Sequence, residues 1–199
     1  MKLVAISQRI DFHKNRGETR DALDQDLCKL IHETGNLPIP VPNSLCAEDD
    51  STSIDKWLKH VSPNAVLLSG GNNIGEFRER DITERALIRY ASESSLPILG
   101  ICRGMQMLAC YYGAKLIKAE GHLKTRHKLF GKLHLEVNSY HEFSINSCPK
   151  EFTIIAKSKD GNIEGIRHSS LPWEGWMWHP EREKEFSPSD IARLHTLFK

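Results

Sequence analysis

The stretch that most constrains the fold is residues 96–113, LPILGICRGMQMLACYYG, where an apolar strand pattern changes into a helical pattern with no loop between them. Cys102 stands at the change, and Gly100 and Gly104 flank it at two-residue spacing. A strand that feeds directly into a helix is typical of α/β folds with a parallel sheet. Glycines on both sides remove the Cβ atoms that a sharp turn would press against its neighbours. The stretch therefore predicts a tight corner with a thiol exposed at its tip.

The rest of the chain fits the same architecture. Its first half alternates predicted strands and helices: strands at 2–7, 37–42, 65–71 and 96–102, and helices at 21–35, 81–94 and 103–116. From residue 132 onward the patterns predict strands of a mixed or antiparallel extension, followed by a closing helix at 187–198. We expect one α/β domain over residues 1–199, a flavodoxin-like fold with a central, mainly parallel sheet flanked by helices.

Composition and charge argue against several classes of function. The 27 Lys and Arg residues nearly balance the 26 Asp and Glu residues, which argues against a bulk electrostatic nucleic-acid binder. Apolar runs are too short to span a bilayer, and the N-terminus turns polar too early for a signal peptide. The five cysteines form no CxxC pair, so we expect free thiols, a cytoplasmic setting and no structural zinc. The expected partner is a small molecule, without nucleic acid or membrane, and a homo-oligomer stays open.

The corner cysteine has a chemical interpretation. The spacing Gly100-x-Cys102-x-Gly104 has the shape of a nucleophile elbow, with sulfur in place of oxygen. The N–H groups of the following helix face the sulfur and favour the thiolate, and the N–H of Arg103 is placed to bind an oxyanion. Cysteine is also often simply buried, and this stretch alone leaves both interpretations open.

A second motif, WMWHPERE, holds His179 and Glu181 on either side of Pro180. In an extended chain these two residues share a face, and we expect the proline to keep the chain out of a helix. A thiol nucleophile needs a base, and the base needs a group that fixes its tautomer. His179 and Glu181 would supply both, although an exposed polar turn is the simpler alternative.

A third motif, LLSGGNNIG at 67–75, places Gly70 and Gly71 directly after a buried strand. The backbone N–H groups of such a loop can approach a ligand closely, so one of them is a candidate to complete the oxyanion hole with Arg103. By itself, a Gly-Gly pair also marks an ordinary turn.

Taken together, these motifs resemble the class I glutamine amidotransferase superfamily and, within it, the gamma-glutamyl hydrolase branch. The matching segments follow the family's order over roughly residues 3 to 185: LLSGGNNI, RERDITERAL, LPILGICRGMQMLACYYGAKL, VNSYHEF and WMWHPE. The resemblance implies that Cys102 is the nucleophile, His179 the general base and acid, and Glu181 its orienting carboxylate. It also implies hydrolysis of a gamma-glutamyl amide through a thioester, with no metal and no organic cofactor.

The resemblance extends to the substrate contacts. It implies that the N–H groups of Gly71 and Arg103 bind the oxyanion and that Gly70 and Gln106 contact the glutamyl group. It places Ser139, Tyr140 and His141 at the α-amino and α-carboxylate ends of that group. The segment VNSYHEF departs from the frequent HHQ pattern of the family, and GGNNI replaces the commoner loop with proline. The leaving group is therefore the least determined part of the substrate.

The segment EGHLKTRHK at 120–128 concentrates positive charge in a chain of net charge +1. A solvated loop is one interpretation. If the segment lines the pocket, Arg126 would contact a phosphate on the leaving group. With this segment, the short chain resembles gamma-glutamyl hydrolases of nucleotide-linked pathways. The resemblance implies release of a nucleotide diphosphoramidate in capsular polysaccharide phosphoramidate synthesis. The alternatives are a gamma-glutamyl-aminobutyrate type hydrolase, a glutaminase subunit that supplies ammonia to a partner synthetase, and a non-catalytic binding protein.

Two further groups of charged or titratable residues are predicted to be solvated. His122, His127 and His134 fit no strong metal-ligand spacing, so we expect loop histidines. The charges of ERDITER, residues 79–85, are expected mostly on the solvated face of a helix.

Overall fold

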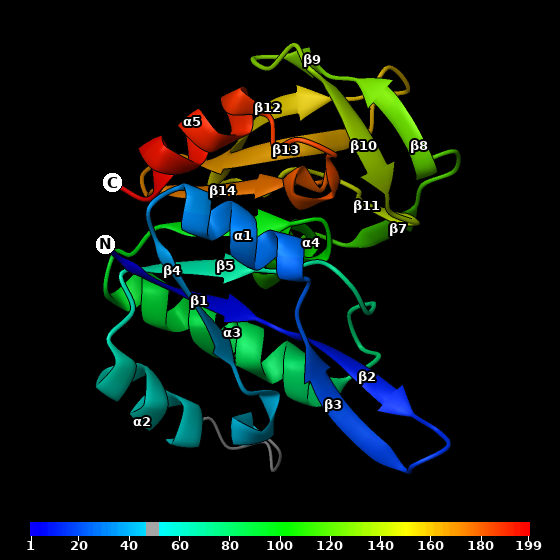
Figure 1. The fold of residues 1–199 in the computed structure, drawn as a ribbon. Coiled ribbons are helices and arrows are strands. Elements are labelled where there is room, and N and C mark those ends of the chain that lie inside the picture. The colour runs from blue at the N-terminus through cyan, green and yellow to red at the C-terminus, as the bar shows by residue number, and fades with distance from the viewer. Residues whose placement is uncertain (47–51) are drawn as a thin grey trace.

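The computed structural model describes residues 1–46 and 52–199 and is built around an eight-stranded sheet (Figure 1). The strands of this sheet are β1 (Leu3–Ser7), β4 (Leu37–Val41), β5 (Ala65–Leu68), β6 (Ile98–Ile101), β9 (Phe130–Gly131), β12 (Phe152–Lys157), β13 (Ile163–His168) and β14 (Trp173–Trp176). They lie in the order β4-β1-β5-β6-β14-β13-β12-β9. The first five pair in parallel and the remaining pairs are antiparallel.

The parallel strands, counted along the chain, follow the order 2-1-3-4-5 of doubly wound flavodoxin-like sheets. The predicted fold class is therefore confirmed. Of the two predicted forms of the extension after residue 132, the structure has the mixed one, because β14 pairs in parallel with β6, whereas β12 and β13 are antiparallel. In this fold, ligands bind at the carboxyl ends of the strands, close to the point where the strand order reverses. That point lies between β1 and β5.

Helices cover both faces of the sheet. The helices α1 (Gln25–Glu33) and α5 (Pro188–Leu197) pack on one face, where they share a core with β-strand residues such as Ile6 and Leu67. The helices α2 (Thr52–Val61), α3 (Arg78–Glu93) and α4 (Arg103–Tyr111) share the core of the other face with residues such as Ala5 and Leu68. Successive strand residues thus point to opposite faces, and both are buried.

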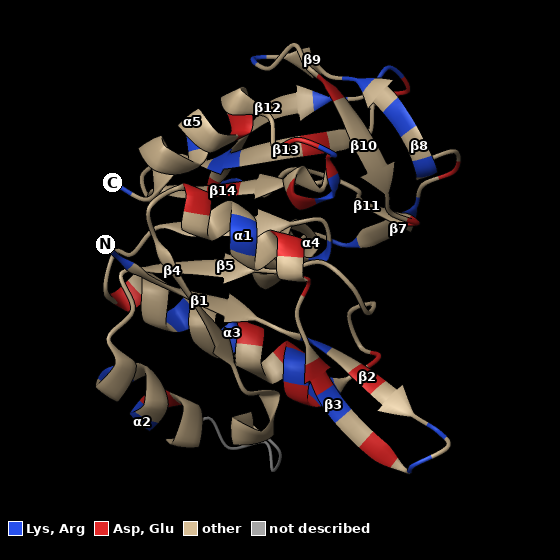
Figure 2. Ribbon diagram, in the orientation of Figure 1, with Lys and Arg blue, Asp and Glu red and all other residues tan. Residues whose placement is uncertain are grey.

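Smaller strand pairs border the central sheet. The pairs are β2 (Arg9–His13) with β3 (Glu18–Ala22), β7 (Leu116–Lys118) with β11 (Phe143–Ile145), and β8 (Leu123–Lys128) with β10 (Glu136–Tyr140). The β2–β3 hairpin extends from the body and carries many charged residues (Figure 2). The sequence pattern does not predict this hairpin, because buried and exposed residues do not alternate along its strands. The predicted helix at 21–35 accordingly starts only at Gln25, where Asp24 caps it with a side-chain oxygen 2.9 Å from the backbone nitrogen of Asp26.

Among the described residues, none of the helices combines the length and the apolar character needed to cross a membrane.

Candidate active site

Three predicted motifs meet at one edge of the sheet. Gly70 and Gly71 follow β5, Cys102 follows β6, and His179 lies shortly after β14. These three strands are consecutive and parallel, so their carboxyl ends lie side by side. The topology therefore brings segments that are far apart in the sequence to one site.

Cys102 occupies a strained corner. Its φ is +50° and its ψ is −105°, values that a residue with a side chain rarely adopts. Cys102 occupies the N-cap position of α4. Such a conformation costs about 1–3 kcal/mol and persists only where the surroundings enforce it. Here the backbone N–H of Cys102 donates to the carbonyl of Trp176 at 2.7 Å, which ties the corner to β14. The sulfur is nearly buried, since Cys102 is 7% exposed.

The flanking glycines are required by close backbone contacts. A Cβ at Gly100 would lie 2.6 Å from the backbone carbonyl carbon of Gly104, and a Cβ at Gly104 would overlap the carbonyl of Leu68. The missing Cβ at Gly100 lets α4 fold back on β6, and the missing Cβ at Gly104 lets α4 pack against β5. The steric explanation predicted for the Gly-x-Cys-x-Gly spacing is therefore confirmed.

His179 and Glu181 form a close pair. The Nδ1 atom of His179 lies 2.6 Å from Oε1 of Glu181, and both side chains are buried. The expectation that Pro180 holds this segment extended is wrong, because residues Pro180–Arg182 form a 3-10 turn. Proline is compatible with the first position of a helical turn, where its fixed φ fits and no N–H is needed. The turn curls Glu181 back toward the imidazole.

The environment of His179 favours its protonated form. Burial lowers the pKa of His179, but the hydrogen-bonding partners Cys102 and Glu181 outweigh burial and raise that pKa to about 9. At neutral pH the imidazole therefore carries a proton beside the sulfur of Cys102. Gly70 makes room for the ring, since a Cβ there would lie 2.6 Å from Cε1 of His179.

Asn138, which the sequence analysis did not single out, holds the backbone of His179. Its side-chain oxygen accepts from the N–H of His179 at 2.9 Å, and its Nδ2 donates to the carbonyl of the same residue at 2.8 Å. Both hydrogen bonds are buried. Asn138 lies in VNSYHEF, one of the segments that carry the family resemblance. The sequence alone does not predict that this residue holds the backbone of His179.

A buried ion network supports the loop after β5. Arg80 donates to the carbonyls of Ser69 at 2.9 Å and Gly70 at 2.8 Å. Glu84 pairs with both Arg80 and Arg103, which links α3 to the elbow helix α4. Burial lowers the pKa of Arg103 to about 9 and that of Arg80 to about 10, so both stay charged at neutral pH.

This network corrects the expectation that the charges of ERDITER, residues 79–85, are mostly solvated. Arg80 and Glu84 are both 0% exposed, and Arg103 also pairs with Asp81. The i,i+4 spacing of Arg80 and Glu84 fits an exposed helix pair equally well. Only the tertiary position of α3 distinguishes the two situations.

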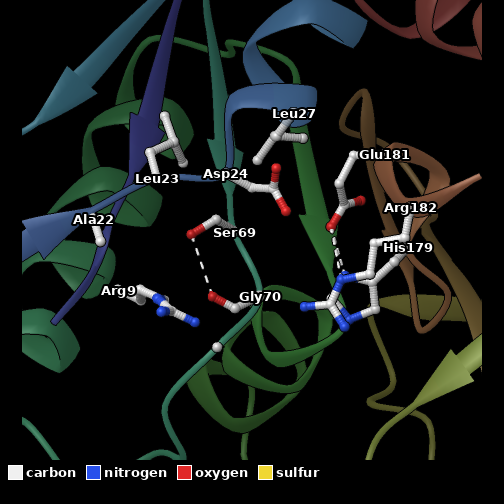
Figure 3. Close-up of a pocket in the computed structure, with 11 residues that line it drawn as sticks. Arg9, Ala22, Leu23, Asp24, Leu27, Ser69, Gly70, His179, Glu181 and Arg182 are labelled. Carbon is white, nitrogen blue, oxygen red and sulfur yellow. Dashed lines mark hydrogen bonds and ion pairs between the residues drawn. The ribbon is translucent and has the colours of Figure 1, made fainter. Parts of the chain in front are cut away.

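Two cavities meet at His179. The Cys102 cavity has a volume of about 360 Å³ and is lined by Cys102, Gln106 and Tyr140 among others. The Arg9 cavity has a volume of about 210 Å³ and lies on the other side of the imidazole. Figure 3 shows the Arg9 cavity, with the side chains of Arg9 and Asp24 directed into it and Glu181 directed at His179. Both cavities share three residues: Gly71, His179 and Arg182.

Most of the predicted contact residues line one of these cavities. Gly71, Cys102, Arg103, Gln106, Tyr140 and His141 border the Cys102 cavity, and Gly70 borders the Arg9 cavity. Gln106 is held in place by its Nε2, which donates to the carbonyl of Phe143 at 2.8 Å. Gly71 has a φ of +91°, which favours glycine at that position.

Two predicted contact residues lie elsewhere. Ser139 is fully buried, and its hydroxyl donates to the carbonyl of His122 at 2.7 Å, so its side chain stabilises the protein interior. Arg126 borders neither the Cys102 cavity nor the Arg9 cavity and instead pairs with Glu183 at 2.9 Å and Glu136 at 3.5 Å. The arginines beside the site are Arg9 and Arg182. Arg9 comes from the hairpin that the sequence analysis missed.

The prediction of solvated loop histidines is also wrong in part. His122 is 3% exposed and lies near His127 and Glu164, with one potential ligand atom from each within 4.8 Å of the others. His134 is exposed.

Comparisons with known proteins agree with this architecture. The family model for glutamine amidotransferase class-I matches residues 20–195. A gamma-glutamyl-CDP-amidate hydrolase of Campylobacter jejuni is 32% identical over 96% of this chain and 95% of its own length. An aminodeoxychorismate/anthranilate synthase component 2 of Bacillus subtilis is 32% identical over 81% of this chain and 84% of its own.

A glutamine-hydrolyzing GMP synthase subunit of Thermoplasma acidophilum is 30% identical over 83% of this chain and 82% of its own length. Among solved structures, a protein of the same organism described as a GMP synthase subunit superposes with a TM-score of 0.72 at 22% identity. The superposition covers 100% of this chain and 93% of that one.

Proposed function

Because the chain belongs to the class I glutamine amidotransferase family, we propose that it hydrolyses a gamma-glutamyl amide with Cys102, His179 and Glu181 as its catalytic residues. The observation that carries this proposal is the strained elbow. It holds a thiol beside a buried imidazole whose other side lies 2.6 Å from a carboxylate. A thiol nucleophile, a base and an orienting carboxylate are the groups that acyl transfer requires.

The reaction proceeds in two steps. The thiolate of Cys102 attacks the gamma carbonyl carbon, and the backbone N–H groups of Arg103 and Gly71 stabilise the oxyanion. As the carbon–nitrogen bond breaks, the imidazolium of His179 gives its proton to the leaving nitrogen. In the second step His179 takes a proton from water, whose oxygen attacks the thioester, and the thiolate leaves with release of glutamate.

The protonation state of His179 fits this order of events. A pKa raised to about 9 keeps the imidazole protonated before acylation, when it must act as an acid. Glu181 stabilises the charged ring and fixes which nitrogen faces the substrate.

The proposed substrate carries phosphate on the leaving nitrogen, and the best candidate is gamma-glutamyl-CDP-amidate. The similar hydrolase of Campylobacter jejuni, alike over nearly the whole chain, supports this choice. The glutamyl group would occupy the Cys102 cavity, and the leaving group would extend past His179 into the Arg9 cavity. Arg9 and Arg182 line that cavity and provide the cations that a diphosphoramidate needs (Figure 3).

A kinetic comparison tests the substrate. The purified protein is assayed with gamma-glutamyl-CDP-amidate, gamma-glutamyl-aminobutyrate and glutamine. We expect the phosphorylated substrate to have the highest kcat/KM. Hydrogen bonds to charged groups contribute about 1.5–3 kcal/mol. Arg9 lines the Arg9 cavity but not the Cys102 cavity, so Arg9→Ala should lower kcat/KM about 10- to 100-fold for that substrate alone.

Arg126→Ala is the matched control, because it removes a nearby cation that pairs with Glu183 outside both cavities. It should leave the ranking of substrates unchanged. Equal kcat/KM for the three substrates would refute the phosphate hypothesis while leaving the amide hydrolase proposal intact.

A second candidate function is a glutaminase subunit that supplies ammonia to a partner synthetase. The similarity to synthase components that match more than four fifths of this chain favours it. Glutamine hydrolysis that is silent in the isolated protein and appears only with a synthetase would select this function. Rapid turnover of gamma-glutamyl-CDP-amidate by the isolated chain would exclude it.

A further inference from the structure

Four side chains in or next to three different strands lie close together, and none of them is a proposed catalytic residue. They are His122, which precedes β8; His127 in β8; His141, which follows β10; and Glu164 in β13. The distance from Glu164 Oε1 to His122 Nδ1 is 3.4 Å, and its distance to His141 Nε2 is also 3.4 Å. Oε2 of the same carboxylate lies 3.4 Å from His127 Nε2.

These atoms are buried without hydrogen-bonding partners. Both oxygens of Glu164 and the facing nitrogens of all three imidazoles make no hydrogen bond among the described residues, and face one another only at the 3.4 Å ion-pair distance. Glu164 is 0% exposed, and His141 and His122 are 2% and 3% exposed. A separation of 3.4 Å exceeds the 2.7–2.9 Å that charge-assisted N–H···O⁻ hydrogen bonds typically adopt. A buried carboxylate with no good donor is costly, so the cluster lacks a component that would satisfy it.

The outer nitrogens of two imidazoles have partners of their own. His122 Nε2 lies 2.9 Å from Asp160 Oδ2, and His141 Nδ1 lies 3.0 Å from the carbonyl of Phe143. An acceptor at the outer nitrogen of His122 places the proton there and directs the lone pair of the other nitrogen inward. This outer partner, a carboxylate or a backbone carbonyl, is the usual arrangement of metal-binding histidines.

The spacing also fits a metal ion. In a tetrahedral site with bonds of about 2.0–2.1 Å, neighbouring ligand atoms lie about 3.3–3.4 Å apart. Within the group His122, His127 and Glu164, whose ligand atoms lie within 4.8 Å of one another, the two nitrogen–oxygen distances of 3.4 Å agree with that value. Imidazole nitrogens with one carboxylate suit zinc and similar late transition metals, whereas magnesium and calcium prefer oxygen ligands.

We propose that His122, His127 and Glu164 form a structural binding site for a divalent transition metal ion of the zinc class, with an open fourth position, and that His141 holds the carboxylate of Glu164. This reverses the sequence-based expectation that His122 and His127 are solvated and that no structural zinc is present. His127 is the most accessible of the four, and a surface cavity of about 510 Å³ lined by His122, His127 and Asp160 provides an entry path.

The site would connect two parts of the fold. β8 and β10 form a separate two-stranded sheet, whereas Glu164 belongs to the central sheet, so the ion would join the two. The same small sheet carries Asn138, which holds His179, and Tyr140, which lines the Cys102 cavity. Bound metal would therefore stabilise one wall of the proposed active site.

Metal binding is measured directly on the full chain. The protein is stripped with a chelator, dialysed and titrated with Zn²⁺ by calorimetry, and in parallel with Co²⁺ by visible absorption. We expect one equivalent to bind, intense absorption bands of tetrahedral Co²⁺ that Zn²⁺ abolishes, and a higher midpoint of thermal unfolding with Zn²⁺ than without it.

Variants assign the ligands. His127→Ala should weaken Zn²⁺ binding more than about 100-fold, and Asp160→Asn, which removes only an outer partner, about 10- to 100-fold. His134→Ala is the matched control, an exposed histidine of the same region that should leave the affinity unchanged.

Failure of the wild-type protein to bind Zn²⁺ stoichiometrically would overturn the proposal, and this result does not depend on whether any variant folds. Equal affinity in His127→Ala and wild type, or loss of binding in His134→Ala, would overturn the ligand assignment. None of these measurements relies on turnover, so the result is independent of the proposed hydrolase function.

Discussion

Two parts of the molecule contribute to the site in different ways. One is the parallel part of the central sheet, and the other is the antiparallel part, which comprises β13, β12 and β9 together with the bordering β8–β10 pair. In the parallel part, Cys102, Gly71 and His179 lie at or just beyond the ends of three adjacent strands, and backbone geometry fixes the elbow. In the antiparallel part, side-chain contacts between distant segments fix the geometry, as with Asn138 and the backbone of His179. Changes in the reactive side chains of the first part should therefore affect chemistry, and changes in its backbone corner should affect the fold. Changes in the second part should affect stability and the positioning of His179.

The largest effect is expected at Cys102. Cys102→Ala removes the nucleophile, so kcat should fall on the order of 10⁴-fold or more, while the thermal midpoint and the circular dichroism spectrum stay close to those of wild type. Steady-state release of glutamate measures this loss.

Cys110→Ala is the matched control, because it lies in the same helix but outside the Cys102 cavity. Burial raises the pKa of its thiol, so it is less reactive. Near-normal turnover by Cys102→Ala would remove Cys102 from its proposed role.

The next largest effects are expected at His179 and then at Glu181. Glu181→Gln should lower kcat by roughly 10²- to 10⁴-fold, less than His179→Asn, since the orienting group does not transfer the proton itself. Glu181 helps to raise the pKa of His179 to about 9, so its removal lowers that pKa. His179 must be protonated to act as an acid. Activity should therefore be lost as pH rises through about 9 in wild type and at a lower pH in the variant.

A pH–rate profile of kcat/KM for both proteins measures this shift. An alkaline limb at the same pH in both, or a larger loss of rate in Glu181→Gln than in His179→Asn, would contradict the assigned roles.

A change in the backbone of the parallel part should affect stability strongly. Gly104→Ala places a methyl group against the carbonyl of Leu68 and should destabilise the fold by about 3 kcal/mol or more. Helix propensity alone predicts the opposite sign, a gain of about 1 kcal/mol.

Gly113→Ala is the control, because Gly113 has a φ of +89° but no atom within 4 Å of an added Cβ. It should cost only about 1–2 kcal/mol through conformation. Urea unfolding of both variants separates the two effects, and a stable Gly104→Ala protein would refute the steric explanation of the elbow.

The contrast between the two parts also explains what the sequence could predict. The Gly-x-Cys-x-Gly spacing and the apolar strands encode local backbone geometry, so the fold class and the elbow were predictable from short patterns. The turn at Pro180 was misjudged, because proline fits both an extended chain and the first position of a helical turn.

Contacts between side chains that are distant in the sequence could not be predicted from the sequence pattern. Arg80 and Glu84 have the spacing of an exposed helix pair, although both are buried. Glu164 and His141 come from different strand regions, so their proximity to His122 depends on how β13 meets the β8–β10 pair. Arg9 lies in a hairpin whose strands do not alternate between buried and exposed residues, so the sequence pattern does not predict the hairpin.

The smallest effect is expected in the antiparallel part at Asn138. Asn138→Ala removes two buried hydrogen bonds to the backbone of His179 and should cost about 1–3 kcal/mol of stability. A modest fall in kcat should accompany it, because the imidazole is held less firmly. Chemical denaturation and turnover are measured on the same preparation. Full stability of this variant would mean that the antiparallel part does not position His179.

The central claim is that Cys102 carries the glutamyl group during turnover. The reaction with gamma-glutamyl-CDP-amidate, or with whichever gamma-glutamyl amide the protein turns over fastest, is quenched in acid and digested with trypsin. Cleavage after Arg103 separates Cys102 from Cys110. Mass spectrometry should find one glutamyl group on the peptide that ends at Arg103, formed and lost at the rate of turnover. Turnover with no adduct there, or with the adduct on another cysteine, would contradict the account.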